Sequence, residues 1–323
     1  MAVYVNTNYS ALQGQRYLGN VQNQLTTTYQ RLSSGMRINS AKDDAAGLQI
    51  ADRLTSQING LNQGNRNASD GIALAQTMEA GMDEVSGMLQ KIRTLAVQAN
   101  NGTNTAEDRT AISKEMSSLA TEVNRIAMKT TFAGKTILNG HTAKDSIFGD
   151  KAGNAPGGPA AGLNGDEGTM TLQVGSNKGD TISFKMTSIM FSVASGTTEL
   201  VKAAAGSVFK TANDGSITVD LTKAEAGNTD KSISAVIDLM DKMIAVVDGK
   251  RADLGAIQNR LESSIRNQSN VAANEADARS RIRDADFAEE SANLSQQSII
   301  QQAAASMLMQ ANTRPQLGLS LLG

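Results

Sequence analysis

The sequence contains no cysteine, no tryptophan and a single histidine, and only 3% of its 323 residues are aromatic. Without cysteine there is no disulfide framework, no thiol nucleophile and no cysteine-based metal site. The lone His141 excludes a zinc hydrolase with two histidines on one helix, and it leaves one candidate for any histidine-dependent triad. These absences argue against an enzyme, and we expect no catalytic residue, metal or cofactor.

Proline is also scarce, because Pro156, Pro159 and Pro315 are the only three. Long helices are therefore permitted over most of the chain. The net charge of −2 gives no general attraction to nucleic acid or to an anionic membrane. No apolar run approaches the roughly 20 residues that span a bilayer. Residues 1–10 lack the basic region and apolar run of a secretory signal. We expect no nucleic acid partner, no membrane insertion, and export without a cleaved signal peptide if the protein leaves the cell.

Three segments repeat apolar residues at alternating steps of three and four, which is the spacing of helices in a coiled-coil-like bundle. The first two segments, separated by NNGTNT, predict a helical hairpin. The third predicts a helix of more than 30 residues, in which Arg251 and Gln258 stand at two core positions. We interpret these two as polar residues at the edge of a seam that set the register. The apolar positions are Ala75, Met78, Met82, Val85, Leu89, Ile92, Ala96 and Ala99; Ile112, Met116, Leu119, Val123 and Ile126; and Ile233, Ile237, Met240, Ile244, Val247, Leu254, Leu261 and Ile265.

The middle of the chain has a different pattern. MTLQV and TISFKM alternate apolar and polar residues on either side of GSNKGD, which predicts a β-hairpin with a long loop. Residues 141–168 and 187–230 are rich in small and polar residues, as loops or a small variable insert would be. The predicted fold is mainly α: a long-helix coiled-coil-like bundle from both chain ends, with a β-hairpin-containing segment and a small variable insert in the middle.

Both chain ends carry helical stripes with few large apolar residues. A helix with so thin a stripe buries too little surface to offset the entropy of ordering it. We therefore expect the two ends to pair with each other and with other copies of the chain, as in a protein that polymerises. The predicted terminal-helix assembly seam consists of Leu18, Val21, Leu25, Leu32, Leu294, Ile300 and Met307.

The segment RINSAKDDAAGLQIADR, at residues 37–53, contains two adjacent carboxylates that admit three interpretations. Ser40 can cap a helix, with Asp43 at the third helical position and Asp44 beside it, because carboxylates there accept from free backbone amides. The pair can instead contact a neighbouring subunit. A metal or acid–base site is the third interpretation, but no further ligand cluster accompanies the pair. We favour the helix cap.

Four long motifs resemble one family: RLSSGMRINSAKDDAAGLQIADRL, LQKIRTLAVQANNGT, LGAIQNRLESSIRN and SQQSIIQQAAASMLMQANTRPQLGLSLLG. Over roughly residues 1–140 and 230–323 the chain resembles bacterial flagellin, the filament subunit. The resemblance implies a non-enzymatic protein that polymerises into the flagellar filament, the helical propeller of swimming bacteria. A hook–filament junction protein of the same family is the alternative. A membrane-inserting translocator is a third possibility, which the weak, Gln-rich apolar faces argue against.

The resemblance also implies an organisation and a set of partners. Residues 1–43 and 277–323 would form an inner coiled-coil tube with its spokes. Residues 44–186 and 231–276 would form a helical core domain with the β-hairpin, and residues 187–230 a small variable outer region. The chain would leave the cell unfolded through the flagellar type III export channel and reside in the extracellular filament. Its partners would be further copies of itself, an export chaperone, and the cap and hook-junction proteins.

Two surface features follow from the resemblance. Flagellins with a segment like LQKIRTLAVQ are recognised by the vertebrate Toll-like flagellin receptor. The matching residues here are Gln90, Lys91, Arg93 and Leu95, with Glu115 on the next helix. Lys91 stands where many recognised members have arginine, and lysine lacks the planar fork of arginine. Some flagellins carry O-linked glycans, and the candidate acceptors in this chain are Ser192, Ser195, Thr197, Thr198, Ser207 and Thr211.

Overall fold

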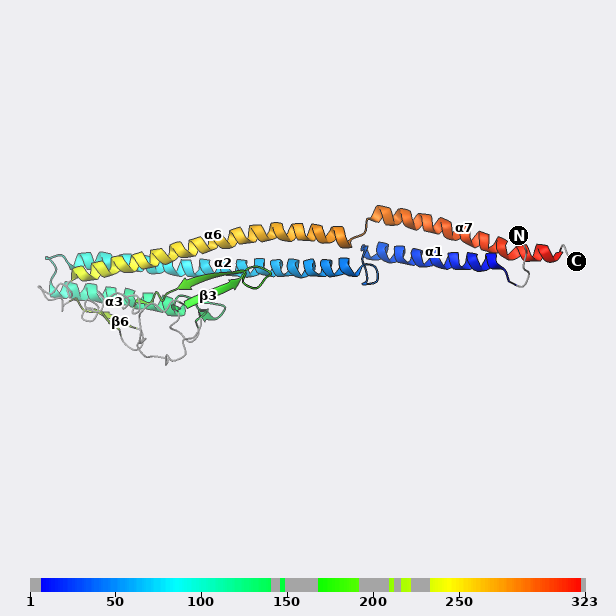
Figure 1. Ribbon diagram of the computed structural model, residues 1–323. Coiled ribbons are helices and arrows are strands. Elements are labelled where there is room, and N and C mark those ends of the chain that lie inside the picture. The colour runs from blue at the N-terminus through cyan, green and yellow to red at the C-terminus, as the bar shows by residue number, and fades with distance from the viewer. Residues whose placement is uncertain are drawn as a thin grey trace. The chain divides into compact units, whose positions relative to one another are not determined.

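The structure is a computed structural model that describes residues 7–140, 146–148, 168–191, 209–211, 216–221 and 233–320. The chain forms two compact units, which we name the terminal unit (residues 1–59 and 270–323) and the central unit (residues 60–269). Long helices dominate both units (Figure 1). They are α1 (Tyr9–Ser34), α2 (Ala45–Ala99), α3 (Ala106–Lys129), α6 (Ile233–Arg283) and α7 (Phe287–Ser320).

The core of the central unit lies between α2, α3, α6 and the strands. The predicted apolar positions of α2 from Ala75 to Ala99 are all at most 1% exposed. Met116 on α3 and Leu261 on α6 are fully buried as well, and the remaining predicted positions on these helices are buried or packed against the same core. The three predicted stripes are therefore confirmed. Each fully buried aliphatic side chain contributes about 1.5–3 kcal/mol by leaving water.

Polar side chains connect α2 to α6 at the edge of this core. Arg251 forms an ion pair with Asp83 at 3.0 Å, and the side-chain amide of Gln258 donates to Glu79 at 3.0 Å. Because the residue numbers fall along α2 as they rise along α6, the two helices are antiparallel. Both polar residues at predicted core positions thus make contacts between helices within the chain. A register role for them in an assembly stays a prediction.

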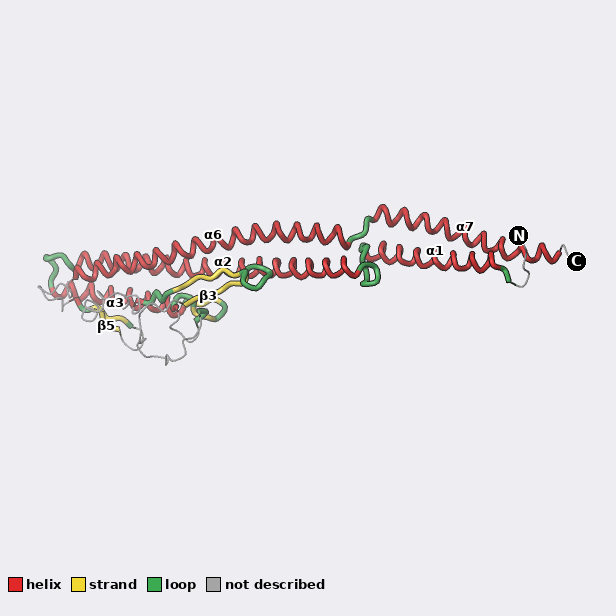
Figure 2. The backbone as a smooth tube through the Cα atoms, in the orientation of Figure 1, coloured by secondary structure: helices red, strands yellow, loops and turns green. Residues whose placement is uncertain are grey.

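The predicted hairpin is confirmed as β3 (Gly168–Gln173) paired with β4 (Thr181–Met186), in an antiparallel register that places Met170 opposite Phe184. Together with the long helices, it makes the fold mainly α with a β-hairpin segment in the middle, as predicted (Figure 2). A second hairpin, whose strands are two residues long, directly follows α3. It consists of β1 (Thr131–Phe132) and β2 (Lys135–Thr136).

The β3–β4 hairpin packs against a face of α2 that carries glycines. A Cβ added at Gly64 would overlap the backbone carbonyl of Val174, and one added at Gly71 would overlap the side chain of Leu172. Between them, the side-chain amide of Asn67 donates to the Gln173 carbonyl at 2.9 Å. The absence of side chains at Gly64 and Gly71 lets the hairpin approach the helix closely at these two positions.

Part of the predicted insert forms a third hairpin, β5 (Phe209–Thr211) with β6 (Ile217–Val219). A row of hydroxyls at four-residue steps on α3 binds the chain at β6. Ser113, Ser117 and Thr121 accept hydrogen bonds from the backbone amides of Leu221, Val219 and Ile217 at 3.2, 2.8 and 3.1 Å, respectively. Four helical residues rise about 6 Å and two strand residues about 6.6 Å, so the two spacings match over three contacts.

The terminal unit contains α1, α7 and the adjoining ends of α2 and α6. Asn8 caps α1 by accepting from the Ala11 amide, and Gly35 ends the helix with φ of 70°, a left-handed conformation that glycine adopts readily. The Asp286 carboxylate accepts from the Ala288 amide at 2.8 Å at the start of α7. The caps thus fix both ends of α1 and the first turn of α7.

Candidate functional site

The α1 and α7 helices lie side by side and antiparallel in the terminal unit (Figure 1). On α1, only Val21 and Thr28 are buried, at 5% exposure each. The other residues at alternating steps of three and four are half-buried: Ala11, Gly14, Leu18, Leu25 and Leu32. On α7, Ala304 and Glu290 are buried. The α1–α7 interface is therefore narrow and contains few large apolar groups.

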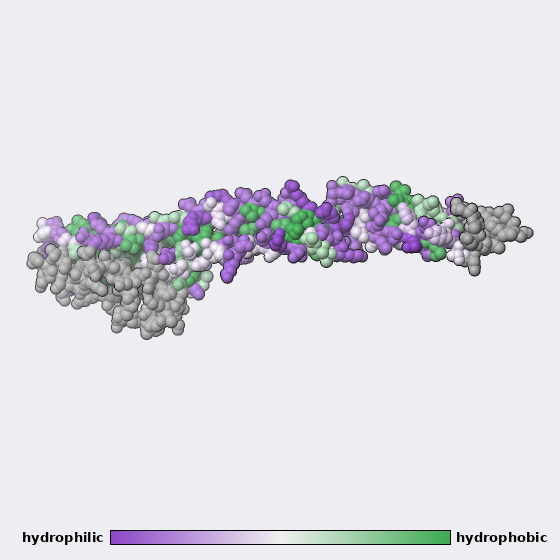
Figure 3. Space-filling model, viewed as in Figure 1, coloured by the Kyte–Doolittle hydropathy of each residue, from purple (hydrophilic) through white to green (hydrophobic). Residues whose placement is uncertain are grey.

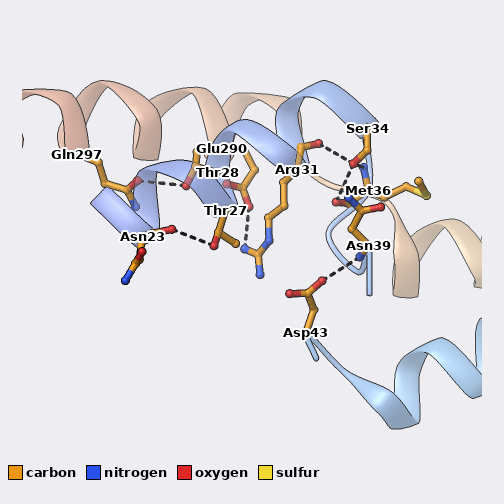
Figure 4. Close-up of polar contacts among 10 residues, drawn as sticks. All are labelled: Asn23, Thr27, Thr28, Arg31, Ser34, Met36, Asn39, Asp43, Glu290 and Gln297. Carbon is orange, nitrogen blue, oxygen red and sulfur yellow. Dashed lines mark hydrogen bonds and ion pairs between the residues drawn. The ribbon is translucent and has the colours of Figure 1, made fainter. Parts of the chain in front are cut away.

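Polar contacts run along the length of this interface. The Asn8 side-chain amide donates to the Ala311 carbonyl at 2.8 Å. The Thr28 hydroxyl donates to the Gln297 side-chain oxygen at 3.2 Å (Figure 4). Arg31 forms an ion pair with Glu290 at 3.0 Å, and the Glu290 side chain is only 9% exposed. Hydrogen bonds and one partly buried ion pair thus hold α1 and α7 together where large apolar contacts are few.

The residues of the predicted terminal-helix assembly seam differ in how far they are buried within one chain. Leu18, Leu25 and Leu32 are half-buried on α1, and Leu294 and Ile300 are half-buried on α7. Met307 is 71% exposed, so it is not buried against α1. Leu308 approaches α1 instead, where a Cβ added at Gly14 would lie 3.2 Å from the Leu308 Cδ1 atom. The role of all these residues in an assembly stays a prediction.

The outer faces of the terminal unit carry large apolar side chains that are exposed to solvent. In the described chain, the central unit exposes two such residues, Val97 and Val246. The terminal unit exposes ten: Tyr9, Leu12, Tyr17, Tyr29, Ile50, Val271, Phe287, Ile299, Met307 and Met309. Figure 3 shows apolar surface, in green, over α1 and α7. Apolar surface gathered in this way marks an interaction site.

A groove of about 770 Å³ runs between the two terminal helices. The α1 residues that line it share one helical face, and the α7 residues come from the last part of that helix in which side chains are described. The lining residues are Ser10, Gln13, Gly14, Tyr17, Ala304, Met307, Gln310, Ala311 and Thr313. The groove is partly open to solvent and has polar and apolar walls, unlike the enclosed, mostly apolar pockets that hold small ligands.

The segment between α1 and α2 corrects one prediction. The helix does not begin after Ser40: α2 begins at Ala45, and the Asp44 carboxylate accepts from the Gly47 amide at 2.9 Å. Asp43 instead closes the preceding turn by accepting from the Ser40 amide at 2.9 Å and from the Ser40 hydroxyl at 3.0 Å. These hydrogen bonds, with one from the Asn39 amide, lower the pKa of Asp43. Both carboxylates accept hydrogen bonds from backbone amides, as predicted. However, Asp44 is the residue that caps α2, and Ser40 donates to Asp43.

A close contact reinforces the start of α2. A Cβ added at Gly47 would overlap the Asp44 carboxylate and lie 2.7 Å from the Cδ1 atom of Ile38, which is 2% exposed. Glycine at position 47 therefore allows both the capping carboxylate and an apolar anchor to approach the first turn of the helix.

The two segments that connect the long helices are paired with each other. Met36 and Asp284 form an isolated antiparallel bridge. The Arg37 amide donates to the Arg283 carbonyl at 2.7 Å, and the Ala285 amide donates to the Gly35 carbonyl at 3.0 Å. Segments about 250 residues apart in the chain thus form one two-stranded joint.

The chain matches known families at both ends. Residues 5–143 match the bacterial flagellin N-terminal helical region, and residues 237–322 match the bacterial flagellin C-terminal helical region. Flagellin B of Vibrio cholerae serotype O1 is 38% identical over 376 residues, and the alignment covers all of both chains. The chain belongs to the bacterial flagellin family. Flagellin D of Vibrio anguillarum is 37% identical over 388 residues, again with full coverage of both chains.

Family membership confirms the predicted function. Flagellin is a structural protein and not an enzyme, and it polymerises into the bacterial flagellar filament. A solved structure of a putative flagellar hook-associated protein from Vibrio parahaemolyticus has a TM-score of 0.54, covering 75% of this chain and 100% of that one. At 17% identity this likeness is one of fold alone. The sequence matches are to flagellins, so the hook–filament junction alternative is not favoured.

The residues that match the receptor-recognition segment of flagellin lie at the junction of α2, α3 and α6. Gln90, Lys91 and Glu115 are exposed, and Lys91 forms an ion pair with Glu115 at 2.9 Å. Arg93 pairs with Asp241 of α6, which raises the pKa of Arg93. Leu95 corrects the prediction of a surface residue, since it is 7% exposed and belongs to the core. Its place in the stripe, three residues after Ile92, could have indicated this.

The remaining predictions concern modification, metals and membranes. Ser192, Ser195, Thr197, Thr198 and Ser207 lie outside the described residues, and Thr211 lies in β5. Within the described ranges, no group of three or more His, Asp or Glu side chains could hold a metal ion. Over the same part of the flagellin chain, we find no helix with the length and apolar character needed to cross a membrane.

Proposed function

We propose that this flagellin enters the filament through the outer faces of α1 and α7, and that its neighbours there are further copies of the same chain. The observation that carries the proposal is that the terminal unit exposes more large apolar side chains than it buries. Of the described residues, it exposes ten large apolar side chains and buries only five apolar residues: Val21, Ile38, Ala51, Ile58 and Ala304. Because apolar surface leaves water favourably, stacking these faces on neighbouring copies would stabilise the polymer.

The joint would connect the inner tube of the filament to its outer part. In this proposal residues 1–43 and 277–323 form the tube and its spokes, residues 44–186 and 231–276 the helical core domain, and residues 187–230 the outer region. The backbone pairing of Met36 with Asp284 and the Asp44 cap support the joint, since they fix the path of the chain between the long helices. They would transmit torque between the two parts.

The proposal includes further partners. The chain would be exported with a chaperone through the flagellar channel, without a cleaved signal peptide, assembled in the extracellular filament under the cap protein, and joined to the hook by junction proteins. Gln90, Lys91, Arg93 and Glu115 would form the surface for a vertebrate Toll-like flagellin receptor. The hydroxyls at positions 192–211 would be candidate glycan acceptors.

Seeded polymerisation tests the central part of the proposal. We expect the full chain to elongate filament fragments without limit, and versions lacking residues 1–35 or 285–323 to remain soluble with the helical signal of the central unit intact. Elongation by either truncated chain would contradict the role of α1 and α7. Growth that stops after a few subunits would instead favour a junction protein. Binding of the monomer to liposomes would favour a membrane-inserting protein.

A further inference from the structure

Two methionines near the end of α7 differ from the others in their exposure. Met307 is 71% exposed and Met309 is 66% exposed. The other methionines in the described part of the chain are half-buried or buried. Those at 0% exposure, all in the central core, are Met78, Met82, Met116 and Met240. An oxidant in solution would therefore reach the thioethers of Met307 and Met309 first, because susceptibility follows exposure.

The two exposed thioethers flank the contact between α7 and α1. Leu308, between them in sequence, approaches Gly14 of α1. Successive residues on an α-helix are separated by about 100° around the axis, so Met307 and Met309 project on either side of Leu308. Met307 also lines the groove together with Tyr17. A chemical change at these two sulfurs alters both flanks of the surface that the proposed function assigns to subunit contacts.

We propose that Met307 and Met309 form a sulfoxidation site through which peroxide-class oxidants block subunit addition. The sulfur of each thioether attacks one oxygen of the peroxide, the O–O bond breaks and an S–O bond forms. The sulfur is oxidised to a sulfoxide by two electrons, and the peroxide is reduced. The departing oxygen takes up the proton that the attacked oxygen carried, so it leaves as water from hydrogen peroxide and as an alcohol from an alkyl hydroperoxide. A flexible apolar side chain thus becomes a polar one on the face of α7 that the proposed function buries against neighbouring copies. This inference rests on the proposed function of α1 and α7.

The state of assembly would control the reaction. In the monomer both thioethers are accessible, whereas in the filament neighbouring copies would cover them. Oxidation would thus act on subunits that have not yet joined, and filaments already formed would be protected. Because methionine sulfoxide reductases restore the thioether, the block would be reversible.

The experiment treats monomer with limiting hydrogen peroxide, locates the added oxygen by peptide mass spectrometry and then measures elongation of filament seeds. We expect modification of Met307 and Met309 before the four core methionines. Each polar sulfoxide buried without a partner should lower the equilibrium constant of subunit addition about tenfold or more. Treatment with the reductases should restore elongation. The same peroxide dose applied to finished filaments should leave both residues unmodified.

Matched variants separate this site from general damage. The double variant Met307→Leu, Met309→Leu keeps apolar volume and removes the reactive sulfurs, so peroxide should not lower its rate of seed elongation below the rate that the same variant shows without oxidant. The control Met82→Leu, Met240→Leu removes two buried thioethers and should stay as sensitive as the original chain. The variant Met307→Gln, Met309→Gln places polar groups at both positions and should elongate poorly without any oxidant.

The outcomes distinguish the two proposals. If untreated monomer with both terminal helices fails to elongate seeds, the proposed function fails. If untreated monomer elongates and fully sulfoxidised monomer does so equally well, the polymerisation surface stands and the sulfoxidation proposal is wrong. The sulfoxidation proposal is also wrong if the leucine double variant loses elongation after peroxide to the same extent as the original chain.

Discussion

The two units of this flagellin use apolar residues in opposite ways. The central unit encloses them: Leu74, Met78, Met82, Leu89 and Ile92 of α2 alone are at most 1% exposed. The terminal unit has comparable helices but directs its large apolar side chains outward, with Tyr9 at 74% and Phe287 at 67% exposure. The stability of the central unit therefore resides within one chain, whereas the proposed function assigns much of the stability of the terminal unit to contacts with other chains.

A matched pair of leucine truncations tests this difference with the largest expected effect. Leu89→Ala empties a fully buried site in the central unit and should lower the free energy of unfolding by about 2–5 kcal/mol. Leu18→Ala, at a half-buried site on α1, should cost the monomer less but slow seeded elongation. Urea denaturation followed by circular dichroism measures the first effect, and light scattering with filament seeds measures the second.

The inferred difference between the units would be wrong if Leu18→Ala strongly destabilised the monomer and Leu89→Ala mainly slowed elongation. A Leu18→Ala monomer that loses as much stability as Leu89→Ala would mean that α1 and α7 already form a complete core in the monomer.

Glycines within the same helix provide the next test. Gly64→Ala should destabilise the central unit by about 1–3 kcal/mol, because the new Cβ overlaps the Val174 carbonyl and displaces the β3–β4 hairpin. Gly87 has no atom within 4 Å of an added Cβ, so Gly87→Ala should stabilise the helix by up to about 1 kcal/mol. Thermal denaturation compares the two variants, and a stabilising Gly64→Ala would contradict the close packing of the hairpin.

The packing of the central unit could be predicted from sequence to the extent that it follows a repeating pattern. The stripes from Ala75 to Ala99 and from Ile233 to Ile265 were predictable because one buried face selects apolar residues at each helical turn. The hairpin was predictable from strict alternation. Its position on the glycine face of α2 was not, because residues 64 and 174 come together only through the tertiary fold.

The joint was harder to predict, because two carboxylates compete for one cap. Asp43 is hydrogen-bonded to the turn at Asn39 and Ser40, so Asp44 becomes the cap and α2 starts at Ala45, later than predicted. Local propensity cannot distinguish these arrangements, since both carboxylates suit a helix start. Met307 and Leu308 present a similar difficulty: steps of three and of four both fit a heptad, and contact with Gly14 selects Leu308.

Removal of the cap should have a moderate effect confined to the terminal unit. Asp44→Ala deprives the Gly47 amide of its acceptor and should cost about 0.5–2 kcal/mol. Asp44→Asn keeps a side-chain oxygen at that position and should cost much less. Hydrogen exchange at the Gly47 amide, with the core amides around Leu89 as internal reference, reports the local change. Equal exchange in all three proteins would mean that Asp44 is not the cap.

The smallest expected effect concerns the titration of one hydrogen-bonded carboxylate in each unit. Hydrogen bonds lower the pKa of Asp43 in the terminal unit, and those from Thr105 lower the pKa of Asp108 in the central unit. Because both values are depressed in the folded chain, their stabilising contribution is present above the ordinary value of 3.8 and is lost as the pH falls through the lowered values.

Carboxyl NMR titration of a Ser40→Ala variant isolates the Asp43 component. Loss of the Ser40 hydroxyl should raise the pKa of Asp43 part of the way towards its ordinary value, while the Ser40 and Asn39 amides continue to donate. Asp108 should titrate unchanged and serves as the control. An unaltered Asp43 titration would mean that the hydroxyl does not stabilise the carboxylate.

The row of hydroxyls on α3 binds residues 217–221 through their backbone. The attachment of this segment therefore depends little on which side chains it carries. Ser113, Ser117 and Thr121 accept from backbone amides of residues 217–221, and the Thr121 hydroxyl also donates to the Ile217 carbonyl at 3.4 Å. Every residue except proline supplies such an amide. Replacements at outward-facing positions of this strand would therefore leave its anchorage to α3 intact. In the proposed filament, the outer region would thus exchange its surface chemistry, and with it what other molecules recognise there, without altering the helices proposed to build the filament.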